Sequence, residues 1–139
     1  MKTKIFAVTF VIAIALTGII GFSTSVKAGN TKDTDYAFYN TNDGGYTEGR
    51  TKENSTKVYI HPTSGPALEY TVQGFGGVSW TDRSNSHIIY NGTQASFTNY
   101  VYENSEVYAR LHFVRTQLAP IYTHGEWSPD STRNYTVYN

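Results

Sequence analysis

Aromatic side chains are the feature of this sequence that could most readily do chemistry. The chain has 12 tyrosines and 2 tryptophans in 139 residues, and every tyrosine follows residue 28. These side chains join an apolar ring to a polar tip, which suits contact with sugars, peptides or partner proteins. The alternative is that the rings are strand formers packed between two sheets. The residues that we expect to form an exposed binding platform are Trp80, Tyr100, Tyr102, Tyr108 and Trp127.

Residue types that support catalysis or metal binding are present, but not in a recognised arrangement. The four histidines form neither a His-x-His pair nor a His-Glu-x-x-His motif, and the lack of cysteine excludes thiolate sites. The Gly-x-Ser-x-Gly motif of serine hydrolases is also missing. Glu103 lies near Glu106 and Glu126 near Asp130, but a glycosidase needs two carboxyls across a cleft, for which this chain has little room. We therefore expect a protein that is not an enzyme, with no metal and no cofactor.

The N-terminal 28 residues have the layout of a secretory signal peptide. Lys2 and Lys4 precede an apolar run over residues 5–22, and Val26 and Ala28 occupy the −3 and −1 positions of a small-residue cleavage site. An uncleaved anchor is the alternative, because the run is close to the ~18 residues that span a membrane. The cleavage site favours a signal peptide that is removed after Ala28, and hence an extracellular protein.

The mature chain, residues 29–139, is expected to form a single domain. Three of the 11 basic residues leave with the signal peptide and all 11 acidic residues remain, so this part is mildly acidic. Binding to nucleic acid requires a basic surface and is not expected. No second long apolar run follows, so we expect no membrane span in the mature chain. The expected partner is a protein, a peptide or a cell-envelope glycan.

Alternation of apolar and polar residues indicates strands through most of the mature chain. The clearest case is 106–116, where Tyr108, Arg110 and His112 share the face opposite the expected core. The other expected strands are 36–39, 57–61, 68–73, 78–81, 87–90, 95–102, 121–127 and 135–138. About seven to nine short strands with no helical period predict an all-β chain, an antiparallel β-sandwich or small barrel.

Glycine, proline and asparagine predict where these strands turn. Asn91-Gly92 predicts a type I′ hairpin between the two strands that flank it. Ser128-Pro129-Asp130 predicts a turn, and the Gly-rich residues 74–77 predict a bulge or bend. Glu103 and Glu106 are expected to flank a hairpin loop.

Two short motifs give the chain a family resemblance. Tyr46-Thr47-Glu48-Gly49-Arg50 and Gly125-Glu126-Trp127-Ser128-Pro129-Asp130, with Thr/Tyr-rich strands between them, resemble an uncharacterised family of small secreted Gram-positive proteins. This resemblance covers most of the mature chain and implies no catalytic residues. The chain is also similar to bacteriocins of the lactococcin 972 type, which are exported, cysteine-free and rich in Gly and Tyr. That similarity implies an antibacterial protein as the alternative function, although this chain is longer and orders its Trp, His and Gly landmarks differently.

Overall fold

The protein is an all-β sandwich. The computed structural model describes residues 29–40, 44–118 and 120–139, and the regular elements in these residues are all strands. The strands are β1 (Thr34–Asn40), β2 (Gly44–Tyr46), β3 (Arg50–Thr51), β4 (Lys57–Ser64), β5 (Leu68–Phe75), β6 (Trp80–Asp82), β7 (His87–Ile89), β8 (Ala95–Phe97), β9 (Tyr108–Arg115), β10 (Ile121–Ser131) and β11 (Thr136–Tyr138). The predicted fold class is confirmed, with the very short β2 and β3 added to the expected set. The proposed signal peptide lies outside the described residues, among which no helix is long and apolar enough to cross a membrane.

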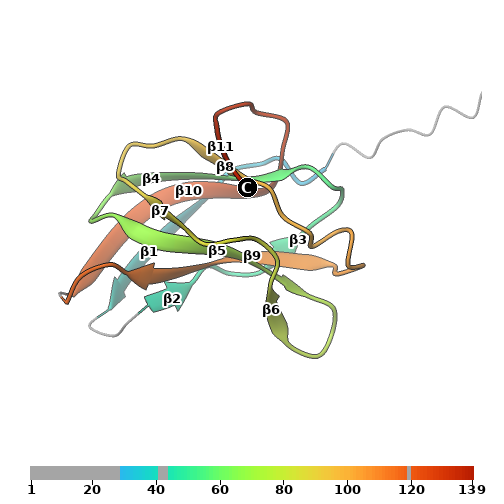
Figure 1. The fold of residues 1–139 in the computed structure, drawn as a ribbon, viewed down its shortest axis with the longest axis horizontal. Coiled ribbons are helices and arrows are strands. Elements are labelled where there is room, and N and C mark those ends of the chain that lie inside the picture. The colour runs from blue at the N-terminus through green and yellow to red at the C-terminus, as the bar shows by residue number, and fades with distance from the viewer. Residues whose placement is uncertain (1–28, 41–43, 119) are drawn as a thin grey trace, which may run out of the picture.

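The strands form two sheets that pack face to face (Figure 1). Sheet A has five strands in the order β1-β10-β4-β8-β11. Sheet B has six, in the order β2-β9-β5-β6, with β3 also paired to β9 and β7 to β5. Pairing is antiparallel except between β11 and β8, which run parallel. Figure 1 shows β4 and β10 of sheet A stacked on β5 and β9 of sheet B.

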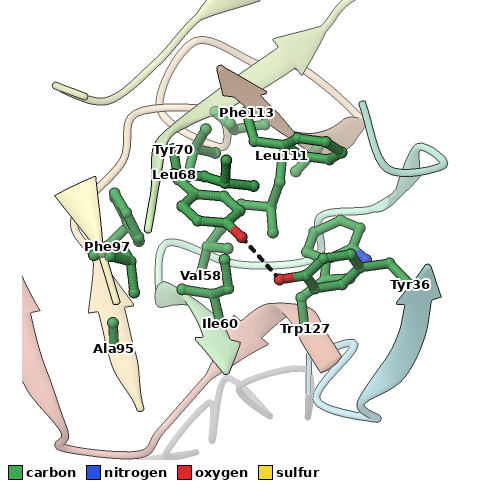
Figure 2. Packing of buried hydrophobic residues seen from close by; sticks show 14 residues of the cluster. Tyr36, Val58, Ile60, Leu68, Tyr70, Ala95, Phe97, Leu111, Phe113 and Trp127 are labelled. Atoms are coloured by element: carbon green, nitrogen blue, oxygen red, sulfur yellow. Dashed lines mark hydrogen bonds between the residues drawn. The ribbon is translucent and has the colours of Figure 1, made fainter. Parts of the chain in front are cut away.

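The inner faces of both sheets meet in one apolar core. Its buried members are Tyr36, Val58, Ile60, Leu68, Tyr70, Val72, Ile89, Ala95, Phe97, Val101, Ala109, Leu111, Phe113 and Trp127. Figure 2 shows Tyr36 of β1 reaching Tyr70 of β5, with the two hydroxyl oxygens 3.2 Å apart. Each hydroxyl thereby has a hydrogen-bond partner away from water. This tyrosine pair links sheet A to sheet B through the core.

The connections on both sides of β8 cross between the sheets, so two hairpin predictions are wrong. β7 pairs with β5 in sheet B, whereas β8 pairs with β4 in sheet A. The Asn91-Gly92 turn therefore joins the sheets, and only its glycine has a positive φ, of 82°, where type I′ needs two such residues. The strand expected over 95–102 ends at Phe97. Residues 98–107, which include Glu103 and Glu106, carry the chain back to β9 in sheet B.

β10 continues through Ser128-Pro129-Asp130, where a turn was expected. The strand runs to Ser131, and its pairing with β4 shifts register between Ser128 and Ser131. Proline has no N–H to donate to a strand partner, so an irregular stretch of this kind accommodates it. The turn prediction is wrong here, and the continued strand keeps Asp130 in the interior. The bend predicted at residues 74–77 is confirmed: the β5–β6 hairpin turns there, with Gly77 at a φ of 110°.

Alkaline pH is expected to unfold the protein as its interior tyrosines ionise. Burial and the neighbouring hydroxyl raise the pKa of Tyr36, and burial also raises the pKa of Tyr70. Burial together with the Glu126 carboxylate raises the pKa of Tyr59 to about 12. Because these values lie above the ordinary 10.0, the stability that they confer is complete below about pH 10 and is lost as the pH rises further.

This expectation can be measured by following phenolate absorbance and circular dichroism through an alkaline titration. The interior tyrosines should ionise in a late step that coincides with loss of β-sheet signal. A single ionisation step for all tyrosines, with the sheet signal intact, would contradict the prediction. Tyr36→Phe removes one partner of the pair and is expected to reduce the amplitude of the late step.

Candidate ligand-binding face

The outer face of sheet B carries a continuous stack of planar side chains. Alternate residues of a strand point to the same side of a sheet, so these side chains lie opposite the core. The ring of Tyr46 stacks on the His112 imidazole with centroids 4.7 Å apart. The guanidinium carbon of Arg110 lies 3.8 Å from the Tyr46 ring centroid and 4.2 Å from that of Trp80. Trp80 in turn contacts Phe75, with centroids 5.3 Å apart. We call these five residues the aromatic row.

Strand register explains how four strands contribute to one stack. Tyr46 on β2 lies directly opposite His112 on β9. Phe75 on β5 lies opposite both Tyr108 on β9 and Trp80 on β6. The indole of Trp80 also reaches the link between β2 and β3. A Cβ at Gly49 would lie 2.7 Å from its ring, so glycine leaves room for the indole.

A chain of hydrogen bonds fixes Arg110 within the row. Its Nε donates to Gln73 Oε1 at 2.9 Å, and Gln73 Nε2 donates to Asp82 Oδ1 at 2.8 Å. Burial lowers the pKa of Arg110, and the Tyr46 phenol partly offsets this. Burial also lowers the pKa of His112, an effect that Asp82 opposes, so the imidazole is mostly neutral at neutral pH. The row therefore holds one positive charge in a fixed position.

The structure brings together only part of the platform expected from the sequence. Trp80 and Tyr108 share the outer face of sheet B, and Tyr108 is 44% exposed. Tyr100 and Tyr102 are also exposed, but they lie on the connection from β8 to β9 and line two separate surface cavities. Trp127 is 1% exposed and belongs to the core. The prediction that Trp127 belongs to an exposed platform is wrong, because its side chain on β10 points into the core.

Sequence reasoning missed Tyr46 and gave Arg110 no role in binding. Period-two alternation did place Arg110 and His112 on the outer side of their strand, beside Tyr108. No local signal connects Tyr46 with them, because β2 and β9 are far apart in the sequence and meet only by strand pairing. The stack is therefore a property of the folded sheet.

The histidines are dispersed over the molecule. The Nδ1 atom of His61 lies 3.3 Å from Glu126 Oε1, and the Nδ1 atom of His124 lies 3.0 Å from Thr63 Oγ1. The Nε2 atom of His87 lies 3.0 Å from the main-chain oxygen of Asn139. In residues 29–40, 44–118 and 120–139, no group of three or more His, Asp or Glu side chains is placed to hold a metal ion.

The two motifs that carry the family resemblance meet beside the aromatic row. Arg50 donates from Nη1 to the Trp127 carbonyl oxygen at 3.1 Å, and its guanidinium carbon lies 5.5 Å from the indole centroid. A cavity of about 240 Å³ opens at this contact, and Tyr46 forms part of its wall. The first motif thus supplies both a member of the row and a contact to the core tryptophan.

The match to a protein family spans both motifs and the aromatic row. Residues 24–131 match the family described as "Protein of unknown function (DUF2712)". The chain belongs to this family. The matched segment includes every residue of the aromatic row and the Arg50–Trp127 contact, whereas β11 lies beyond it. Comparison with curated proteins and with solved structures finds no match. Membership in DUF2712 supplies no activity, so the functional argument depends on the geometry of the face.

Proposed function

We propose that this protein acts outside the cell as a non-catalytic binding protein, and that its ligand docks on the outer face of sheet B. The observation that supports this most directly is the aromatic row together with exposed rings around it. Tyr46 is 50% exposed, although its ring stacks on His112 and Arg110, and Tyr108, opposite Phe75 on the same face, is 44% exposed. Rings that are already held in place lose little conformational entropy when a ligand binds, so they offer contact area at low cost.

Export is the part of the proposal that the N-terminal sequence supports. The charged start, apolar run and small-residue site are typical of a signal peptide cleaved after Ala28. Expression of the full chain in an exporting bacterial host is expected to release a product that begins at Gly29. N-terminal sequencing of the released protein tests this, and a product that remains in the membrane with residues 1–28 attached would contradict it.

The binding face is tested by alanine substitution on the two opposite sheets. The exported protein is incubated with insoluble peptidoglycan and wall polysaccharides, and the bound fraction is measured. Tyr46→Ala is expected to weaken binding about tenfold or more, since a central aromatic contact contributes about 2 kcal/mol or more. Tyr39→Ala is the matched control, because Tyr39 is 70% exposed on β1 of sheet A. If both variants lost binding equally, or if only Tyr39→Ala lost binding, the ligand would not dock on the outer face of sheet B.

Two further results would replace the proposal with another function. Release of soluble sugars or peptides from these polymers by the pure protein would show an enzyme. Growth inhibition of related strains, with no retention on any wall fraction, would favour the bacteriocin-like alternative.

A further inference from the structure

Arg110 has no carboxylate partner among the described residues, in contrast to three other cations of the fold. Arg50 also lacks one, but its Nη1 and Nη2 both donate, to the Trp127 carbonyl oxygen and to Asn30 Oδ1. Lys52 pairs with Asp130 at 2.7 Å, Arg83 with Glu106 at 2.6 Å, and Arg133 with Asp33 at 2.7 Å. Arg110 forms no such pair with any residue in the described part of the chain, and its only hydrogen bond there is the one from Nε to Gln73. A partly buried charge without a counter-ion is unfavourable. The fold nevertheless holds this one in place.

The orientation of Arg110 leaves its terminal nitrogens available. The Tyr46 and Trp80 rings contact the flat guanidinium, and Gln73 accepts from Nε. The N–H groups of Nη1 and Nη2 make no hydrogen bond to the residues that the structure describes. A guanidinium presents such a pair of donors in a planar fork that matches the two oxygens of a carboxylate or phosphate. Because stacking has already ordered the fork, little entropy would be lost on capturing an anion.

The surroundings of Arg110 suit a sugar chain. Exposed rings with hydroxyl tips, Tyr46 and Tyr108, lie on the same open sheet face as the planar guanidinium of Arg110. Apolar rings beside planar hydrogen-bonding groups complement a sugar, which has C–H surfaces bordered by hydroxyls. Small free ligands are usually enclosed in a pocket, whereas an open face suits a polymer that lies across the strands.

We propose that the ligand is an acidic glycan, and that Arg110 receives its carboxylate or phosphate while Tyr46 and Tyr108 contact the sugar rings. This inference rests on the proposed binding function and adds the chemical class of the ligand.

The experiment compares acidic sugars with neutral partners of the same skeleton. The probes are hexagalacturonate and its methyl ester, and a phosphorylated mannose pentasaccharide and its dephosphorylated form, each titrated calorimetrically into the exported protein. At least one acidic probe is expected to bind about tenfold or more tightly than its neutral partner, because charge-assisted hydrogen bonds are about twice as strong as neutral ones. The two arms distinguish a carboxylate ligand from a phosphate ligand.

Substitutions assign the preference for acid to Arg110. Arg110→Gln is expected to abolish the preference, and Arg110→Lys to retain only part of it, because lysine keeps the charge but loses the planar fork. Arg115→Gln removes the same charge from the far end of β9 and should leave the preference unchanged. If circular dichroism shows that Arg110→Gln does not fold, the preference for acidic sugars is compared between Arg110→Lys and the wild type. A reduced preference in Arg110→Lys then supports the role of Arg110, and an unchanged preference contradicts it.

The outcomes separate this inference from the proposed function. Equal binding of acidic and neutral sugars, lost in Tyr46→Ala, overturns the acidic ligand and leaves the binding face standing. A preference for acid that survives in Arg110→Gln overturns the role of Arg110. Tighter binding of poly-glutamate than of either acidic sugar overturns the glycan. If the wild type binds none of the probes, the proposal of an acidic glycan ligand is overturned. The proposed binding function is then tested separately, by the retention of the protein on wall polymers.

Discussion

Replacing Asp130 with asparagine is expected to lower the free energy of unfolding by about 3–5 kcal/mol. Lys52 Nζ lies 2.7 Å from Asp130 Oδ1, and neither side chain has any exposed surface. The carboxylate also accepts hydrogen bonds from the main-chain N–H groups of Asn30 and Glu53. Asparagine has nearly the same shape and can still accept from the main chain. The loss would therefore come from leaving Lys52 as a buried charge without a counter-ion.

The pH dependence of the Asp130→Asn variant identifies this cause. Burial lowers the pKa of Lys52, while the hydrogen bond and the charge of Asp130 partly restore it. Without the carboxylate, the pKa of Lys52 in the folded state falls further below its value in the unfolded chain. The variant should thus regain stability as the pH rises from about 7 to about 9 and Lys52 loses its proton. Urea unfolding at the two pH values measures the change.

A double substitution supplies the control. Lys52→Met combined with Asp130→Asn removes both charges and keeps an acceptor for the two main-chain donors. This variant is expected to be more stable than Asp130→Asn alone, since breaking a buried pair is worse than removing it. The prediction would be contradicted if the free energy of unfolding of Asp130→Asn lay within about 1 kcal/mol of the wild-type value and the difference did not change with pH. The Lys52–Asp130 pair would then belong with the ion pairs that contribute little to stability.

The sequence was sufficient to predict the strands whose pattern is local. Alternation on β5 and β9 reports directly which side chains enter the core, because the period of a strand is two. Leu68 and Leu111 are accordingly fully buried, and Arg110 lies on the outer face as expected. The sandwich class follows from these short alternating strands, and the structure confirms it.

Strand partners could not be predicted in the same way. Asn91-Gly92 is compatible with a hairpin and with a turn that leads from one sheet to the other. The choice depends on where Ile89 and Phe97 become buried, and both lie in the shared core on strands of different sheets. Such a choice is made by long-range packing, which no window of sequence contains.

Asp130 shows the same limit for a polar residue. Next to Ser128 and Pro129 it has the composition of a solvated turn, which is what local propensity predicts. Its partner Lys52 precedes β4, and only the pairing of β4 with β10 brings the two together. The candidate binding face has a similar origin, because Tyr46 joins Arg110 through the pairing of β2 with β9.

Trp127→Ala is expected to destabilise the protein by about 3–5 kcal/mol, as for other large aromatic side chains removed from a core. Trp127 is 1% exposed, packs in the apolar cluster between the sheets, and supports the guanidinium of Arg50. Its loss would leave a large cavity beside the contact of the two motifs. Urea unfolding measures the change, with Trp80 remaining as the single fluorescent tryptophan.

The comparison with Tyr108→Ala decides whether Trp127 is a core residue or a contact residue. Tyr108 is 44% exposed on the outer face of sheet B, so its removal is expected to change stability by about 1 kcal/mol or less. Trp127→Phe, which keeps most of the apolar volume, should fall between the wild type and Trp127→Ala. A stable Trp127→Ala protein that no longer binds wall polymers would return this tryptophan to the ligand-binding platform. A large loss of stability places Trp127 in the apolar interior between the sheets, where its indole contacts Arg50.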